Sequence, residues 1–264
     1  MNIALQDKQS VRSLVSEAEW ATRIELAAFY RAVDMLGLTE QIYNHISARV
    51  PDADDQLLLN PFGLDYSEIT ASSLVKVDFE GNVILPSPTG YDFNYAGFVI
   101  HSAVHKARHD LICVAHTHSD AGTAVSTHKS GLLPITQNAL RYIDDVAYHD
   151  YEGVAVDLDE RERLVQNLGT KNNMILRNHG LLACGRSIAE AYLNLYNLEK
   201  AFRIQVQALA CGDDLIEIDP RAIARNREIY SNGRVEKPTN GYTSDMEWAA
   251  MRRKIDRLDD SYAL

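Results

Sequence analysis

Two stretches decide how this chain is interpreted: Val114-Ala115-His116-Thr117-His118 and, further along, Leu176-Arg177-Asn178-His179-Gly180. The first is an apolar run with a histidine at every second position near its end. Such a run predicts a strand, and the side chains of a strand alternate between its two faces. His116 and His118 therefore project from the same face, where two imidazoles can bind one metal ion.

His179 can supply the third ligand. It follows the apolar run Met174-Ile175-Leu176, which also predicts a strand, and Gly180 lets the backbone turn sharply just past the imidazole. A borderline divalent metal prefers nitrogen donors at about 2 Å. We therefore predict that His116, His118 and His179 bind a divalent metal, zinc first, with manganese or iron as alternatives. A lone histidine would be better explained as an ordinary polar residue at a strand end.

The composition is that of a folded protein with an acidic surface. The chain has 264 residues, of which 46% are hydrophobic and 24% charged, and a net charge of −11. We expect no nucleic-acid partner, because binding phosphates requires clustered basic residues and none is visible. We expect no membrane association either: no run reaches the roughly 18 apolar residues of a membrane span, and the first residues do not resemble a signal peptide.

Cysteine usage points to a reducing compartment. Cys113, Cys184 and Cys211 are odd in number, widely spaced and set in apolar surroundings. This pattern predicts buried free thiols, not a disulfide framework or a cysteine-based zinc site. We therefore expect a cytoplasmic protein.

Strand-like and helix-like segments alternate along the chain, with no repeat or linker between two halves. We predict an α/β fold in a single domain over residues 1–264, with its core at about residues 20–210 and a C-terminal extension at 212–264. Predicted helices cover 10–38, 98–108, 121–127, 189–209 and 245–256; predicted strands cover 46–50, 56–59, 75–79, 83–85, 112–116 and 174–178.

The chain resembles the class II aldolase/adducin superfamily. His116, His118 and His179 match the His-x-His and His-Gly zinc ligands of its sugar-phosphate aldolases. Over about residues 20–210 the amino-acid sequence is most similar to the adducin head domain. The matching stretches are residues 43–47 (YNHIS), 61–76 (PFGLDYSEITASSLVK), 96–98 (AGF), 146–151 (VAYHDY) and 176–181 (LRNHGL). The resemblance implies a three-layer α/β/α fold around a mainly antiparallel sheet, and commonly a tetramer with sites at subunit interfaces.

Two departures from the aldolases stand out. Counting back from His116 without gaps places Gly97 where a Ser-Ser-Glu segment has its glutamate, the fourth metal ligand and base of those enzymes. The segment 134–138 reads Pro-Ile-Thr-Gln-Asn and lacks the tyrosine acid that a neighbouring subunit supplies. Adducins keep the fold without a functional metal triad. Here all three histidines are present, and such imidazoles cost free energy unless something satisfies them.

Candidate substrate-binding residues follow from the same resemblance. Asn44, His45 and Ser47 fall at a Gly-Asn-x-Ser segment that binds substrate phosphate, and Asn60 and Gly63 fall at a Thr-Pro-x-Gly loop. Both segments can hold an anion through backbone and side-chain donors. The alternative is that they are turn and strand-end residues.

The stretch Tyr148 to Tyr151 is the best source of a general acid or base. His149 beside a carboxylate can titrate near neutrality, and Tyr151 is the accompanying phenol. A structural turn with hydrogen-bonded tyrosines is the alternative. Elsewhere, the spacing of His101 and His105 predicts successive turns of one helix, with His101 facing the site and His105 in solvent. Arg177 either steers a substrate carboxylate or forms a peripheral salt bridge.

Two functional hypotheses remain. The first is a metal-dependent lyase that acts on a small oxygenated acid or carbonyl compound by aldol cleavage or decarboxylation. The metal polarises the carbonyl and stabilises the enolate. The superfamily also includes a pyridine-dicarboxylate decarboxylase, and decarboxylation requires no base to remove a carbon-bound proton. The second is a non-catalytic, adducin-like interaction module of the actin-cytoskeleton type. The apolar C-terminal helix around Trp248 and Met251, with the family's interface sites, favours a homotetramer.

Overall fold

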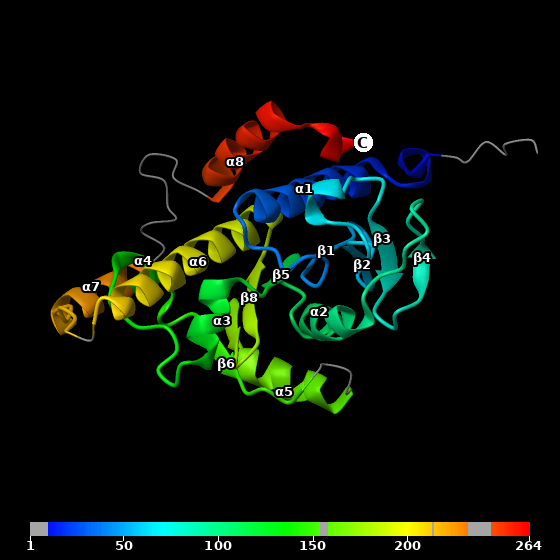
Figure 1. Cartoon of the computed structure of the whole chain (residues 1–264). Helices are drawn as coiled ribbons and strands as arrows, with labels where there is room; N and C mark the ends of the chain where they lie inside the picture. Colours follow the sequence, from blue (N-terminus) through cyan, green and yellow to red (C-terminus); the bar gives the residue numbers. More distant parts are fainter. Residues whose placement is uncertain (1–9, 154–157, 213, 232–243) are drawn as a thin grey trace, which may run out of the picture.

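The computed structural model describes residues 10–153, 158–212, 214–231 and 244–264 (Figure 1). Its strands form one eight-stranded sheet in the order β4-β3-β2-β1-β5-β8-β7-β6, in which the pair β6–β7 is parallel and the other pairs are antiparallel. The strands are β1 (His45–Arg49), β2 (Gln56–Leu59), β3 (Val75–Asp78), β4 (Val83–Leu85), β5 (Cys113–Thr117), β6 (Val146–His149), β7 (Asn173–Leu176) and β8 (Gly180–Gly185). The predicted α/β class with a mainly antiparallel sheet is confirmed.

The described helices vary widely in length. They are α1 (Glu17–Met35), α2 (Tyr95–Ala107), α3 (Asp120–Thr127), α4 (Gln137–Tyr142), α5 (Leu158–Leu168), α6 (Ile188–Ala210), α7 (Pro220–Ser231) and α8 (Ser244–Leu258). Short 3₁₀ helices are η1 (Val11–Leu14), η2 (Tyr66–Glu68) and η3 (Ser261–Ala263). Most predicted elements are present with ends shifted by a few residues. The helix predicted from Phe98 starts at Tyr95 because the Asn94 side chain caps it, accepting from the Ala96 N–H at 3.0 Å.

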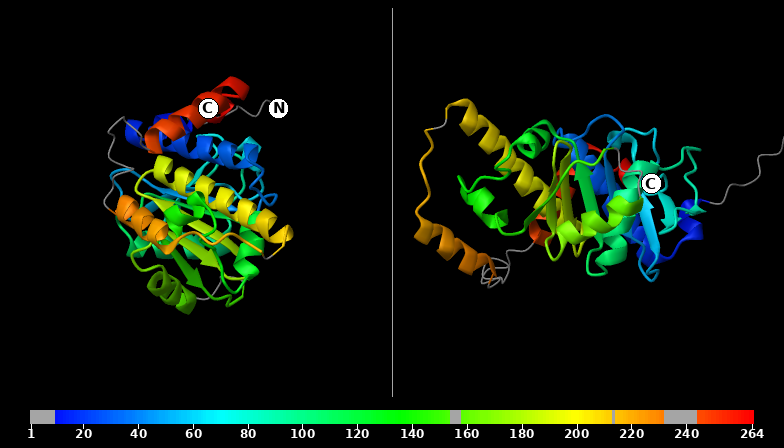
Figure 2. Two further views of the ribbon diagram at one scale, coloured as in Figure 1. Left: turned by 90° about the vertical axis from the view of Figure 1, so that its left-hand side faces the viewer. Right: turned by 90° about the horizontal axis from the view of Figure 1, so that it is seen from below.

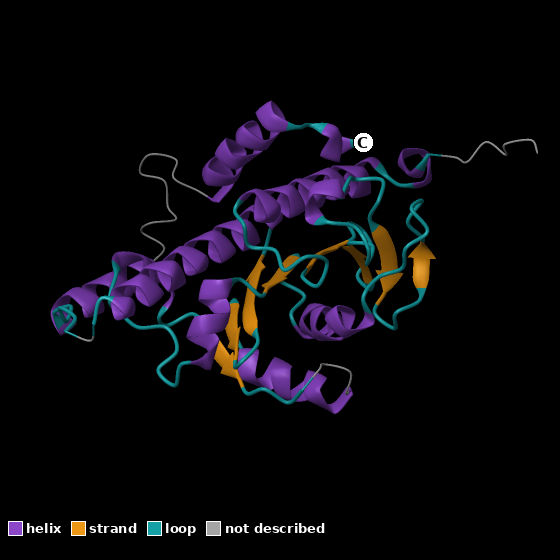
Figure 3. Ribbon diagram, in the orientation of Figure 1, coloured by secondary structure: helices purple, strands orange, loops and turns teal. Residues whose placement is uncertain are grey.

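Helices cover both faces of the sheet, as predicted. Figure 3 shows α1 and α6 on one face and α2 and α5 on the other, and Figure 2 shows the same three layers in a second direction. Successive strand residues supply the two interfaces in turn because their side chains point to opposite faces. In β5, Ala115 packs in the core beneath α1 and α6, whereas Val114 packs in the core beneath α2 and α5.

The sheet topology brings distant histidines to one edge of the molecule. β1 and β5 are antiparallel neighbours, and their register places His45 directly opposite His116. β8 pairs with the other side of β5, and the turn from β7 into β8 carries His179. The start of β1, the end of β5 and the β7–β8 turn therefore lie side by side.

The C-terminal helix buries its apolar side chains within this chain. Trp248 and Met251 of α8 are buried, and the Trp248 ring lies 6.0 Å from Phe29 in α1 and 4.9 Å from Tyr192 in α6. These side chains therefore offer no free apolar face for assembly, which removes one of the two arguments for a homotetramer. Part of the predicted extension, residues 213 and 232–243, lies outside the described residues.

The three cysteines are free, as expected, but they differ in exposure. Cys113 and Cys184 are buried in strands, whereas Cys211 is exposed, contrary to the prediction, because it caps the far end of α6. Among the described helices, none is long and apolar enough to cross a membrane.

Candidate metal centre and its pocket

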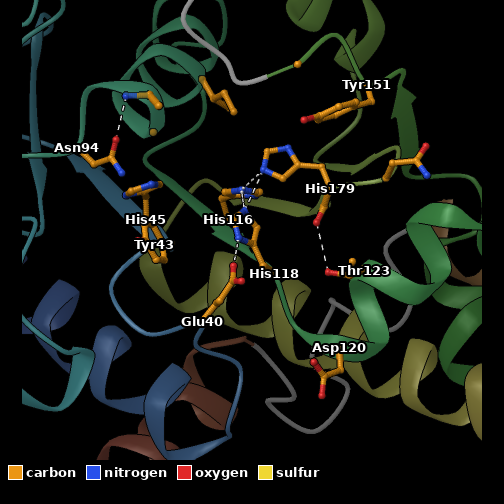
Figure 4. Close-up of a pocket in the computed structure, with 15 residues that line it drawn as sticks. Glu40, Tyr43, His45, Asn94, His116, His118, Asp120, Thr123, Tyr151 and His179 are labelled. Atoms are coloured by element: carbon orange, nitrogen blue, oxygen red, sulfur yellow. Dashed lines mark hydrogen bonds and ion pairs between the residues drawn. The ribbon is translucent and has the colours of Figure 1, made fainter.

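The three predicted metal ligands converge. The Nε2 atom of His118 lies 2.7 Å from Nε2 of His116 and 2.9 Å from Nε2 of His179, and the remaining pair is 3.3 Å apart. Figure 4 shows the three rings pointing at one another, His116 and His118 from the end of β5 and His179 from the turn between β7 and β8. Among the described residues, they form the group of histidine, cysteine and acidic side chains that is compact enough to hold a metal ion.

In His116 and His118, Nε2 points into the triad and Nδ1 points away from it. The partner of each outer nitrogen, Nδ1, determines which nitrogen carries the hydrogen. Nδ1 of His116 lies 3.0 Å from the carbonyl oxygen of Leu181, and Nδ1 of His118 lies 2.5 Å from a carboxylate oxygen of Glu40. A carbonyl and a carboxylate only accept hydrogen bonds, so both Nδ1 atoms carry the hydrogen. When both rings are neutral, their Nε2 atoms therefore present lone pairs to each other at 2.7 Å, an arrangement that a bound cation satisfies.

The surroundings favour the neutral form of His116 and His179, which is the form that binds metal. Burial lowers the pKa of His116 well below its usual value, and the neighbouring His179 and His118 lower it further. Burial, with a smaller effect of His118, lowers the pKa of His179 to about 4.

The β7–β8 turn is built differently from the prediction. Asn178, not Gly180, adopts a left-handed conformation, with φ of 54°. Gly180 serves a close approach instead: a Cβ atom there would lie 2.3 Å from the carbonyl oxygen of Thr117. Glycine lets β8 pair tightly with β5, and the turn residue before His179 then aims its ring at the end of β5. Thr123 of α3 holds the His179 backbone by donating to its carbonyl oxygen at 3.3 Å.

Glu40 is a functional candidate that the sequence did not suggest. It lies in the loop between α1 and β1, 78 residues before its partner His118. Its backbone N–H donates to the Asn44 side chain at 2.6 Å, so Asn44 holds the loop that carries the carboxylate. No local pattern marks such a residue, because only the fold brings it to the histidine.

The triad lines a pocket of about 790 Å³. We call the side formed by His116, His118, His179 and Glu40 the metal wall, and the side formed by His45 and Gly97 the β1 wall. The other lining residues are Tyr43, Asn94, Ala96, Ile100, Asp120, Thr123, Tyr151, Gly153 and Asn178. Among the described residues, no lysine or arginine lines this pocket, whereas the carboxylates Glu40 and Asp120 do.

Of the predicted substrate-binding residues, His45 lines the pocket. The side chains of Asn44, Ser47 and Asn60 are buried in the protein: Asn44 holds Glu40, and Asn60 accepts a hydrogen bond from Tyr30 at 3.0 Å. Gly63 packs against the Tyr91 ring. A substrate contact by these four residues stays a prediction, and they do not line the pocket of the triad.

The two predicted acid–base residues lie on different sides of one segment. Tyr151 lines the pocket, and its ring lies 6.4 Å from the ring of His179. His149 is buried at the end of β6, where its Nδ1 lies 2.8 Å from the Asn167 amide of α5. Arg177 points elsewhere, donating to the His128 carbonyl oxygen at 2.8 Å and stacking on the Tyr148 ring.

Behind the β1 wall, two histidines of α2 face the sheet. Ser47 Oγ lies 2.7 Å from Nδ1 of His101 and 2.9 Å from Nε2 of His105. The prediction of a solvent-exposed His105 is wrong, because α2 packs this face onto β1 and buries the ring completely. Burial, with a smaller effect of Arg49, lowers the pKa of His105 to about 3.

With this geometry established, comparison with known proteins identifies the family. The family model described as "Class II Aldolase and Adducin N-terminal domain" matches residues 24–206. The chain belongs to this class II aldolase and adducin family. Class II aldolases generally use a divalent metal, and the histidine triad fits that use.

Both aldolases and adducins of this family are similar to this chain. The crystal structure of an aldolase II superfamily protein from Pseudomonas syringae has a TM-score of 0.89 and 47% identity, covering 97% of this chain and all of that one. An L-fuculose 1-phosphate aldolase from Glaciozyma antarctica has a TM-score of 0.79 and 29% identity, covering 92% of both chains. Mouse alpha-adducin is 43% identical over 249 residues, which cover 92% of this chain and 34% of the adducin.

Proposed function

We propose that this protein is a divalent-metal lyase that breaks a carbon–carbon bond in a small, oxygen-rich carbonyl or acid compound. The metal, zinc first, is held by His116, His118 and His179. Decarboxylation and aldol-type cleavage are the two reactions that this class of site supports. A bound divalent ion would polarise the substrate carbonyl and stabilise the negative charge that develops on oxygen.

The observation that carries the proposal is the set of facing lone pairs in the metal wall. Leu181 and Glu40 fix the hydrogens of His116 and His118 on Nδ1, so in the neutral rings the two Nε2 atoms meet without a proton between them. Such partners orient ligating histidines and raise their basicity in metal proteins. A scaffold with no metal would gain nothing from this arrangement, because buried polar groups without partners are costly.

The pocket favours a compact chelating acid over a sugar phosphate. A phosphate carries up to two negative charges and is usually met by arginine, lysine or backbone donors. Among the described residues, no lysine or arginine lines this pocket, whereas the carboxylates of Glu40 and Asp120 do. The positions of the aldolase Ser-Ser-Glu segment read Tyr95-Ala96-Gly97, so the base of those enzymes is also absent.

Tyr151 is the proposed proton donor for the product. Its phenol is half exposed at the edge of the pocket, close to the ring of His179. Loss of carbon dioxide leaves a carbanion that needs a proton from a nearby acid, and a positioned acid typically contributes 10²–10⁴-fold. His149 is kept as a proposed positioning residue for this segment, because its ring is held by Asn167 inside the protein.

An adducin-like interaction module is the second candidate function. The similarity to mouse alpha-adducin over 92% of this chain favours it, as does the absence of a glutamate at position 97. A scaffold predicts a folded protein that needs no metal. The lyase predicts a metal held by the triad.

Metal analysis of the purified protein separates the two candidates. We expect close to one divalent ion per chain, lost from the His116→Ala and His118→Ala variants while their circular dichroism stays that of the folded protein. The wild type with added zinc, manganese or magnesium is then assayed with chelating keto- and hydroxy-acids and with fuculose- and ribulose-type phosphates. We expect carbon dioxide release from the first class and little cleavage of the second. A folded, metal-free wild type would refute the lyase.

Assembly and location complete the proposal. We propose a homotetramer, now on the family resemblance alone, since α8 packs inside the chain. Sedimentation of the protein as a 29.6 kDa monomer at micromolar concentration would refute it. Three free cysteines fit a reducing compartment, and we propose the cytoplasm.

A further inference from the structure

The first turn of α2 contains a glycine for a steric reason. A Cβ atom at Gly97 would lie 2.2 Å from Cδ2 and 2.4 Å from Nε2 of His45, well inside any real contact distance. The imidazole therefore lies directly against the bare Cα atom of the glycine. Glycine destabilises a helix relative to alanine, so the chain accepts a weaker α2 to keep this ring in place.

The His45 ring is fixed in position and yet lacks a hydrogen-bond partner. The residue is only 7% exposed, and the edge-to-face contact with His101, at 6.1 Å and 88°, holds the ring from behind. Within the described part of the chain, neither ring nitrogen of His45 forms a hydrogen bond. Buried polar groups are normally paired, so an unpaired imidazole that lines a pocket is available to a ligand.

The position of this ring relative to the triad completes the argument. The β1–β5 register puts His45 directly across from His116, and Figure 4 shows the two rings as neighbours on the pocket surface. A small molecule that reaches the metal wall therefore lies within reach of His45. Gly97, which packs against the ring, offers no side-chain hydrogen bond. Tyr43 and Asn94 lie beside His45 in Figure 4, and the Asn94 side-chain oxygen already accepts from the Ala96 N–H in capping α2.

We propose that His45 is the substrate-contacting group of the β1 wall, and that Gly97 is required because it leaves the space which the imidazole occupies. The inference rests on the proposed lyase function and adds the residue that recognises the substrate. An imidazole at position 45 and any side chain at position 97 exclude each other in this backbone. The site thus meets a substrate oxygen with a neutral hydrogen-bonding ring, where a carboxylate on α2 has no room.

Oxalate, a small chelating dicarboxylate, serves as the probe in a double-mutant cycle. Isothermal titration measures its affinity for the zinc-loaded wild type, His45→Ala, Gly97→Ala and the double variant. We expect about tenfold weaker binding for His45→Ala at unchanged zinc content, the worth of one hydrogen bond. Gly97→Ala should weaken binding similarly by displacing the ring, and should have no further effect once His45 is alanine.

Each result decides the inference. Affinity of His45→Ala within about twofold of the wild type, at full zinc content, would overturn the substrate contact. An equal loss from Gly97→Ala with and without His45 would overturn the steric coupling. Should Gly97→Ala fail to fold, as judged by thermal melting, His45→Ala still tests the contact. A wild type that binds no zinc would overturn the proposed function and the contact together, so the two failures are distinguishable.

Discussion

The two walls of the pocket treat the same side chain in opposite ways. In the metal wall, His116 and His118 each have the outer nitrogen tied to a fixed acceptor, so their inner nitrogens are aimed at one point. In the β1 wall, His45 is held by packing, and its nitrogens have no partner within the described residues. A hydrogen bond to the outer nitrogen fixes the direction of the inner nitrogen, which suits a metal ligand. Packing alone holds the His45 ring in place and leaves both of its nitrogens available to a substrate.

The strongest test of this difference is whether zinc binding depends on the metal wall alone. We expect His179→Ala to weaken zinc binding by on the order of 10²–10³-fold, because the site loses one of its three histidines, and zinc sites with four ligands are worth about 10–16 kcal/mol in total. His45→Ala, the matched variant in the β1 wall, should bind zinc as the wild type does. Competition with a chromophoric chelator measures both. Comparable losses would make His45 a fourth ligand and merge the two walls.

Removing the polar anchor of His118 should have a smaller effect. Glu40→Ala deletes the acceptor that orients the ring, and loss of such a partner typically costs 10–100-fold in metal affinity. Asp120→Ala is the control, because this pocket carboxylate is turned away from the triad in Figure 4. The same chelator competition applies. If both variants lost affinity equally, the effect would be one of general charge and not of orientation.

The smallest expected effect concerns the histidines that support the β1 wall. Burial holds the pKa of His105 at about 3, below its value of about 6.5 in an unfolded chain. Its contribution to stability is therefore complete above pH 6.5 and is lost as the pH falls from there towards 3, because the unfolded chain takes up the proton first. Each such histidine gives a slope of about 1.4 kcal/mol per pH unit.

Urea unfolding of the zinc-free protein between pH 7 and pH 5 measures this slope. The free energy of unfolding of His105→Gln should depend less on pH than that of the wild type, by up to about 1.4 kcal/mol per pH unit, which corresponds to one proton. The exposed His109→Gln is the matched control on the turn after α2, and we expect it to keep the wild-type slope. An unchanged slope for His105→Gln would mean that His105 is protonated equally in both states.

Much of the metal centre could be predicted from the sequence. Alternation in β5 is a local property of a strand, so the shared face of His116 and His118 follows from their spacing alone. The third histidine could be named because a strand-like run with His-Gly at its end resembles the family pattern. The direction of the His179 side chain could not be derived from the sequence, because it depends on the left-handed conformation of Asn178 and on the close contact between Gly180 and Thr117.

What the sequence left open depends on which element covers which face. The spacing of His101 and His105 places both on one side of α2, but only packing against β1 decides that this side is buried. Glu40 and His118 are 78 residues apart, and His45 and Gly97 lie on different elements. The sequence alone predicted most of the described strands and the longest helices, together with the three ligating imidazoles, because these follow from local periodicity and spacing; it did not predict β6, β8, α4, α5 or α7. Tertiary structure decided the partners of each imidazole, because hydrogen bonds and steric exclusion act over a few ångströms between segments that are far apart in the chain.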